Sequence, residues 1–356
     1  MKVIIDSIVD TKLKNEGLFL HRFSALYSLA CALSPQCQFL IFTNEDIAHV
    51  ENTKDVQVHS FRVPGNFLLK LQFMRRLKQK IISWKADIIL HPGTLPYFRH
   101  THQVLFIKNE TELTELPSKK IKRTSLFFAA STFIQQQLIH NHHLSSEKII
   151  VTPFAITPYY KSISWEQKEI TKSKYSSSAE FFLYNHPPSS EPDFVQLLKA
   201  YSMFKKRLQT NMKLLISSSF PVTNKKVAQL LETYKFKEDI VFTGTITVDQ
   251  TAELTAAAYA VIQSAQKQSV SQIQDILQCG VPVIILQPDE WTKDQDCFEY
   301  ANDLSPEEIA GKMMQLYKDE AHRNKLISNS QQLLSQFSVE ATAKTFHTAL
   351  LRAAAE

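Results

Sequence analysis

Glycine is scarce in this sequence, with six residues among 356, far below the usual content of roughly 7%. Glycine supplies the left-handed and side-chain-free positions that phosphate-binding loops need. Neither G-x-G-x-x-G nor G-x-x-x-x-G-K-S/T occurs anywhere in the chain. These absences argue against a fingerprint dinucleotide-binding fold and against a P-loop NTPase.

Cysteine is scarce too, and no long apolar run is present. The four cysteines include no C-x-x-C pair, which favours free buried thiols over disulfides or a metal site. No histidine spacing matches H-E-x-x-H or a zinc finger, so we expect neither a metal nor another cofactor. No stretch approaches the roughly 18 apolar residues of a membrane-spanning helix, and the first residues do not resemble a signal peptide. The sequence therefore predicts a cytoplasmic protein.

Negative charge is in short supply in the first half of the chain. Residues 1–160 contain 19 Lys and Arg against 12 Asp and Glu, whereas the remaining residues contain 21 against 23. A basic half favours an anionic surface or ligand on that side. Nucleic acid is not the expected partner, because no RNA-binding signature is present and the formal net charge is a modest +5.

Short apolar runs alternate with helical patterns along the whole chain, which is typical of mostly parallel, doubly wound sheets. Residues 161–179 are polar, rich in serine and lysine and without apolar periodicity, so they are predicted to be a linker. The pattern predicts two Rossmann-like α/β domains, residues 1–160 and 180–337, and a last helix over 338–356. Ligands are then expected outside the carboxyl ends of the strands.

The second half contains a strand ending in glycine, a short helix, a strand ending in serine, and a helix leading into Gly-Val-Pro-Val-Ile. These features lie in residues 239–244, 248–254, 260–264 and 275–284. The series resembles the donor-binding domain of family 4 glycosyltransferases (group 1, GT-B fold), and residues 130–133 and 147–151 resemble its acceptor domain. The resemblance implies two Rossmann-like domains with an inter-domain cleft, and a C-terminal helix that crosses back to the first domain.

Several donor-site motifs of that family are altered here. The E-x7-E pair falls on Lys267 and Asp275, so only the second carboxylate, which in the family holds the nucleotide ribose, is kept in shortened form. The basic pair that clamps the donor diphosphate is absent from residues 186–193. The family's His-Asp pair aligns with Lys108 and Asn109.

A donor site is therefore predicted in the second domain. Its expected residues are Gly244, Thr245, Ser264, Ser269, Ser271 and Asp275. Ser269 and Ser271 begin a helix whose free N–H groups would face a diphosphate, while a capping box of Ser271 with Gln274 is the alternative. Asp275 would accept a hydrogen bond from a ribose hydroxyl, or else is a solvated helix residue.

Two lysines are the candidate catalytic residues, and three residues mark the expected acceptor side. Lys267 and Lys108 would offset charge on the leaving diphosphate, with solvent-facing loop lysines as the alternative. The acceptor is expected near Gly17 and near the loop that contains His91 and Gly93.

Residues 67–85 are predicted to form a helix with six basic residues and no acidic one. Its apolar residues are Leu68, Leu71, Met74, Ile81 and Ile82, with Trp84 near the end. A basic amphipathic helix of this kind favours the surface of an anionic membrane. The alternative is a helix packed on the sheet with a solvated basic face.

Two functions remain open at this point. The first is a hexosyltransferase that moves a sugar from a nucleotide sugar to a glycan or lipid-linked acceptor in cell-envelope polysaccharide synthesis, in the cytoplasm or peripherally on the inner face of the membrane. The second is a catalytically silent GT-B protein that acts as a binding or partner subunit of an active glycosyltransferase.

Overall fold

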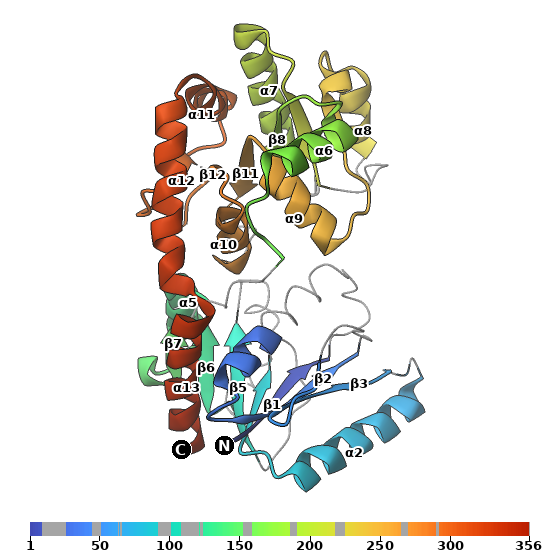
Figure 1. Cartoon of the computed structure of the whole chain (residues 1–356), viewed down its shortest axis with the longest axis vertical. Helices are drawn as coiled ribbons and strands as arrows, with labels where there is room; N and C mark the ends of the chain where they lie inside the picture. The colour runs from blue at the N-terminus through green and yellow to red at the C-terminus, as the bar shows by residue number, and fades with distance from the viewer. Residues whose placement is uncertain are drawn as a thin grey trace. The chain divides into compact units, whose positions relative to one another are not determined.

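The computed structural model divides the chain into two compact units, each built around a parallel sheet (Figure 1). It describes residues 1–8, 26–44, 51–62, 64, 66–91, 101–107, 121, 124–151, 159–185, 191–217, 225–264, 270–289 and 292–355. The first unit contains residues 1–157 and 337–356, and the second contains residues 158–336. The last helix of the chain therefore belongs to the unit that contains the N-terminus.

The sheet of the first unit has the strand order β3-β2-β1-β4-β5-β6-β7 among the described residues. The strands are β1 (Lys2–Ser7), β2 (Gln38–Thr43), β3 (Val56–Ser60), β4 (Ile88–His91), β5 (His102–Ile107), β6 (Leu126–Ala129) and β7 (Ile149–Val151), the last preceded by a 3₁₀ turn (Ser146–Lys148). The central strands are apolar along nearly their whole length because helices cover both faces of the sheet.

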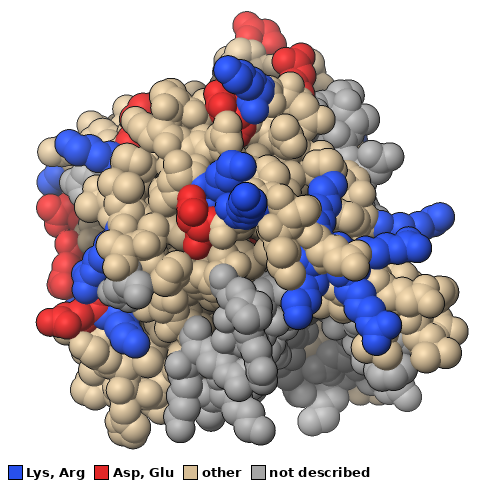
Figure 2. Space-filling view, turned by 90° about the horizontal axis from the view of Figure 1, so that it is seen from below, with Lys and Arg blue, Asp and Glu red and all other residues tan. Residues whose placement is uncertain are grey.

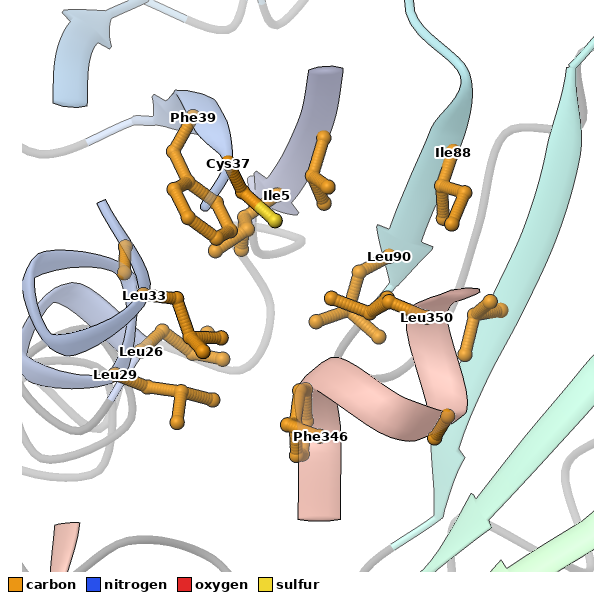
Figure 3. Close-up of a cluster of buried hydrophobic side chains, with 14 of the residues drawn as sticks. Ile5, Leu26, Leu29, Leu33, Cys37, Phe39, Ile88, Leu90, Phe346 and Leu350 are labelled. Carbon is orange, nitrogen blue, oxygen red and sulfur yellow. The ribbon is translucent and has the colours of Figure 1, made fainter. Parts of the chain in front are cut away.

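Different helices cover the two faces of this sheet. On one face α2 (Phe67–Trp84) packs against β1, β2 and β4 through Leu77 and Ile81. On the other face lie the helical residues 26–33 and α13 (Val339–Ala355), while α5 (Thr132–His142) lies beside β6 and β7. Figure 3 shows Leu26, Leu29 and Leu33 on one side and Phe346 and Leu350 on the other, around the strand residues. The C-terminal helix thus completes the core of the first unit.

The sheet of the second unit has the order β10-β9-β8-β11-β12-β13 among the described residues. The strands are β8 (Phe181–Tyr184), β9 (Lys213–Ile216), β10 (Ile240–Phe242), β11 (Ala260–Ser264), β12 (Val283–Leu286) and β13 (Phe298–Ala301). The helices are α6 (Trp165–Ser176), α7 (Glu191–Leu208), α8 (Lys225–Glu232), α9 (Val248–Ala257), α10 (Val270–Gln278), α11 (Pro306–Lys318) and α12 (Glu320–Leu334), with 3₁₀ turns at Lys237–Asp239 and Ser335–Phe337.

The predicted linker is wrong, because twelve of its residues form helix α6. Ser164 and Gln167 make a capping box that satisfies the first N–H groups of this helix. Lys172 is buried and donates a hydrogen bond to Glu180 at 2.8 Å. Capping and ion pairs stabilise α6 where apolar periodicity is missing, so a search for apolar periodicity did not detect it.

Strand β13 was not predicted either, because the sequence Phe-Glu-Tyr-Ala places a carboxylate in the middle of an edge strand. Glu299 is only 5% exposed. Its carboxylate lies 2.8 Å from Lys312 Nζ and 2.5 Å from His322 Nε2. These two partners, from α11 and α12, compensate the cost of burying the charge.

Acid is expected to destabilise the first unit through His59. Lys80 Nζ of α2 lies 2.8 Å from His59 Nδ1 of β3, a contact that requires this nitrogen to accept. Burial and the Lys80 charge lower the pKa of His59 from its ordinary value of 6.5. As the pH falls below 6.5 the unfolded chain binds the proton first, so stability is lost down to the lower folded pKa and is constant below it.

The measurement is the melting temperature at steps between about pH 7 and pH 5, for the wild type and for His59→Gln, whose side chain does not titrate. The wild type should lose more stability over this interval than the variant. Identical pH profiles would show that His59 does not carry this dependence.

Candidate functional site

The carboxyl edge of the second sheet collects several of the predicted donor residues. Ser264 is the last residue of β11, is 6% exposed, and pairs in register with Leu286 of β12. Gly244 and Thr245 follow β10 on the same edge, since all the paired strands are parallel. This edge is where ligands bind in open α/β sheets.

Gly244 is required for its backbone conformation. Its φ of +74° lies in the left-handed region, and an added Cβ would meet nothing within 4 Å. The sequence-based reason, close approach of a ligand, is therefore not what restricts the position in this structure. Thr245 beside it is exposed, and Thr243 anchors the turn by donating its N–H to Ile216 O at 3.1 Å.

Asp275 lies on α10, the helix that follows β11, and is only 2% exposed. The alternative of a solvated helix residue is therefore wrong. Burial, and then the negative charge of Asp275, raise the pKa of the Tyr160 hydroxyl, and the same two causes in the same order raise the pKa of the Cys279 thiol. Asp275 thus lies within electrostatic reach of Tyr160, a residue that the sequence patterns did not point to.

The neighbouring Gln274 is 1% exposed, and neither of its amide atoms has a hydrogen-bond partner among the described residues. A buried amide without partners is uncommon in a folded protein and is a marker of a ligand site. Helix α10 begins at Val270, so Ser271 is its second residue and not the N-cap that the predicted capping box requires. Gln274 is therefore available for another role.

A separate hollow of about 530 Å³ lies between α6 and α9 in the same unit. Its lining includes Lys161, Ile170, Asp249 and Glu253. Two carboxylates against one lysine repel an anionic group. This hollow is therefore a poorer place for a diphosphate than the N-terminal end of α10.

Polar groups also gather at the carboxyl edge of the first sheet. His91 ends β4, is 1% exposed, and has its Nδ1 3.4 Å from Asp6 Oδ2 of β1. Ser7 of β1 pairs in register with Thr43 of β2, and both side chains are buried. Asp6, Ser7 and Thr43 were missed, although each lies at the end of an apolar run.

Five of the predicted site residues, Gly17, Gly93, Lys108, Lys267 and Ser269, and also the side chain of Ser271, lie outside the described residues. Within the described ranges no cluster of His, Cys, Asp and Glu that could hold a metal ion is found. None of the described helices is long and apolar enough to cross a bilayer.

Known proteins with this architecture transfer sugars. Residues 166–333 match the family model described as glycosyl transferases group 1. This segment is a group 1 glycosyltransferase domain. No curated protein sequence matches the chain significantly.

Solved structures that match the whole chain extend the comparison to both units. Anabaena HepE in complex with UDP-glucose is 14% identical, with coverage of 99% of this chain and 100% of that chain and a TM-score of 0.73. A glycosyltransferase from Rickettsia africae is 14% identical, with coverages of 99% and 98% and a TM-score of 0.72. WaaG, a glycosyltransferase involved in lipopolysaccharide biosynthesis, is 13% identical, with coverages of 97% and 98% and a TM-score of 0.66.

The predicted fold class is confirmed: the chain has the GT-B fold, with two Rossmann-like units and a C-terminal helix that belongs to the first. Within the group 1 glycosyltransferase domain, α10 brings together the kept carboxylate, Asp275, and the buried amide of Gln274. Both lie on the helix that begins at the carboxyl edge of the sheet.

Proposed function

We propose that this protein is a hexosyltransferase that moves a sugar from a nucleotide-sugar donor to a hydroxyl of a glycan or lipid-linked acceptor in cell-envelope polysaccharide synthesis. The observation that carries the proposal is the buried Asp275 on α10 of the group 1 domain, beside the unpartnered amide of Gln274. HepE, which is solved with UDP-glucose, supports the donor class, and WaaG supports the envelope context.

The chemistry of the step explains why these groups suit a donor site. Transfer breaks the bond between the anomeric carbon and a diphosphate oxygen, so negative charge builds on the leaving group. The first N–H groups of α10 have no partner within the helix and form the positive end of its dipole. They would bind the diphosphate, while Asp275 would accept from the ribose hydroxyls. No metal ion is needed for this arrangement.

The remaining predicted residues enter the proposal with lesser roles. Lys267, three residues before α10, and Lys108, directly after β5, would add positive charge near the diphosphate. Gly17, His91 and Gly93 would lie on the acceptor side. Of these, His91 is at the carboxyl edge of the first sheet, in contact with Asp6.

A second candidate function is a silent partner subunit of an active glycosyltransferase. It is favoured by Lys267, which stands where the family has a glutamate, and by the lack of a basic residue over 186–193. Such a protein would keep the fold and nucleotide binding, or the fold alone, without transferring a sugar.

Thermal unfolding with a panel of nucleoside diphosphates and nucleotide sugars tests the proposal. A ligand at 100 times its dissociation constant should add about 2.7 kcal/mol to the free energy of unfolding. No stabilisation by any nucleotide at millimolar concentration would contradict the enzyme. Where a nucleotide sugar binds, slow release of the diphosphate supports the transferase, and binding without any release supports the silent subunit.

A further inference from the structure

Helix α2 has an apolar face that the sheet uses. Leu77 and Ile81 are buried against β1, β2 and β4, and Phe73 and Met74 are half-buried beside them. The contact of Lys80 with His59 turns one cation towards the sheet as well. These contacts account for the attachment of the helix, so further apolar residues are not needed for it.

The outward face of α2 nevertheless carries four large aliphatic side chains. Leu68 is 67% exposed, Leu69 51%, Leu71 48% and Ile82 56%. They are half of the eight exposed large hydrophobic residues in the part of the chain that the structure describes. A helix that only packs on a sheet has a polar outward face. A concentration of exposed apolar groups on one element marks a surface that binds another body.

Positive charge surrounds these side chains. Arg75, Arg76, Lys78 and Lys85 are exposed, and residues 67–85 contain no Asp or Glu. Leu71, Arg75, Lys78, Ile82 and Lys85 are spaced three or four residues apart, so they share one side of the helix. Figure 2 shows Lys and Arg side chains gathered without an acidic neighbour on the side where α2 lies in Figure 1. The outward face is thus apolar and cationic together.

The topology places the start of α2 at a defined edge of the sheet. Six residues, 61–66, separate it from β3, and β4 follows it in parallel orientation. A helix that connects parallel strands runs antiparallel to them, so its first turns lie at their carboxyl ends. The exposed leucines are therefore near the edge that carries Asp6 and His91.

We propose that the outward face of α2, defined as Leu68, Leu69, Leu71, Arg75, Arg76, Lys78, Ile82 and Lys85, binds the surface of a bilayer that contains anionic phospholipids. The aliphatic side chains enter the interfacial region, and the cations lie at the lipid phosphates. The carboxyl edge of the first sheet then faces the membrane. For the acceptor the inference rests on the proposed function: it selects a lipid-linked acceptor over a free glycan.

Sedimentation of the full chain with extruded vesicles tests this surface. The protein should pellet with vesicles of phosphatidylcholine and phosphatidylglycerol at low salt, and less as salt is added, because the lipid charge is screened. It should stay in solution with phosphatidylcholine alone. Failure to pellet with the anionic vesicles at low salt, or equal pelleting with both kinds, would overturn the inference.

Two double variants and two controls locate the contact. R75Q/K78Q should weaken binding about 30-fold, since each cation near the surface contributes about fivefold. L68S/L71S should also weaken it, whereas K206Q/R207Q and I170S, which change exposed residues of the second unit in the same way, should not. Unchanged binding of both α2 variants would overturn the proposal, as would a wild-type dimer that L68S/L71S dissociates.

The vesicle measurement is independent of the nucleotide measurement. The α2 variants lie outside the group 1 domain, so their stabilisation by a nucleotide should equal that of the wild type. Vesicle binding without a nucleotide response would contradict the proposed function alone. A nucleotide response without vesicle binding would contradict the membrane surface alone.

Discussion

Replacing Phe346 by alanine is expected to lower the free energy of unfolding of the first unit by about 3–5 kcal/mol. Phe346 is 2% exposed and lies in the main core of this unit (Figure 3). Its ring centroid is 4.4 Å from that of Phe128 and 6.4 Å from that of Phe106. The truncation therefore removes aromatic contacts and leaves a cavity between α13 and the sheet.

Urea unfolding followed by Trp84 fluorescence isolates the first unit, because the other two tryptophans, Trp165 and Trp291, are in the second and can be changed to phenylalanine. Leu351→Ala on the same helix is the matched control, since Leu351 is 51% exposed and should change stability by less than about 0.5 kcal/mol. Equal effects of the two substitutions would mean that α13 is not part of this core.

Asp275→Asn is expected to weaken nucleotide binding about 10- to 100-fold, because a hydrogen bond to a charged acceptor contributes about 1.5–3 kcal/mol. The substitution keeps the size of the side chain and removes its charge. The charge also contributes to the raised pKa values of Tyr160 and Cys279, so the environment of α10 is expected to respond. The melting temperature without nucleotide separates this structural response from the loss of binding.

Calorimetric titration with UDP measures the change, and Glu253→Gln serves as the control. Glu253 is an exposed acid of α9 in the same unit, and it lines the hollow between α6 and α9. Its substitution should leave the affinity unchanged. Tighter binding by Glu253→Gln with no change in Asp275→Asn would move the diphosphate from α10 to that hollow.

Local patterns predicted most of the elements, and their failures have physical causes. The apolar runs of β1, β2 and β6 and the caps of α5 and α9 are properties of adjacent residues, so they can be recognised in the sequence. Helix α6 was missed because a capping box and ion pairs stabilise it. Strand β13 was missed because the partners of Glu299 come from residues 312 and 322.

The amphipathic reading of α2 was partly right. One apolar stripe was predicted, with Leu68, Met74 and Ile81 together. In the structure Ile81 is buried against the sheet and Leu68 is exposed, so the apolar residues divide between two faces. Trp84 turns to the N-terminal strand, with Lys2 Nζ 5.5 Å from its ring centroid. Only the position of the sheet decides which side of a helix is inside.

The scarcity of glycine, the alternation of apolar runs with helices and the Asp275–Gly280 spacing were sufficient for the sequence to determine two doubly wound domains and the resemblance to group 1 glycosyltransferases. These are local properties, which a chain carries before it folds. The burial of Asp275 and Gln274, the contact of Asp6 with His91, and the place of Phe346 in the first core join residues that are distant in sequence or depend on packing from several elements. Only the tertiary structure could decide them, because burial is a property of the neighbours that folding brings together.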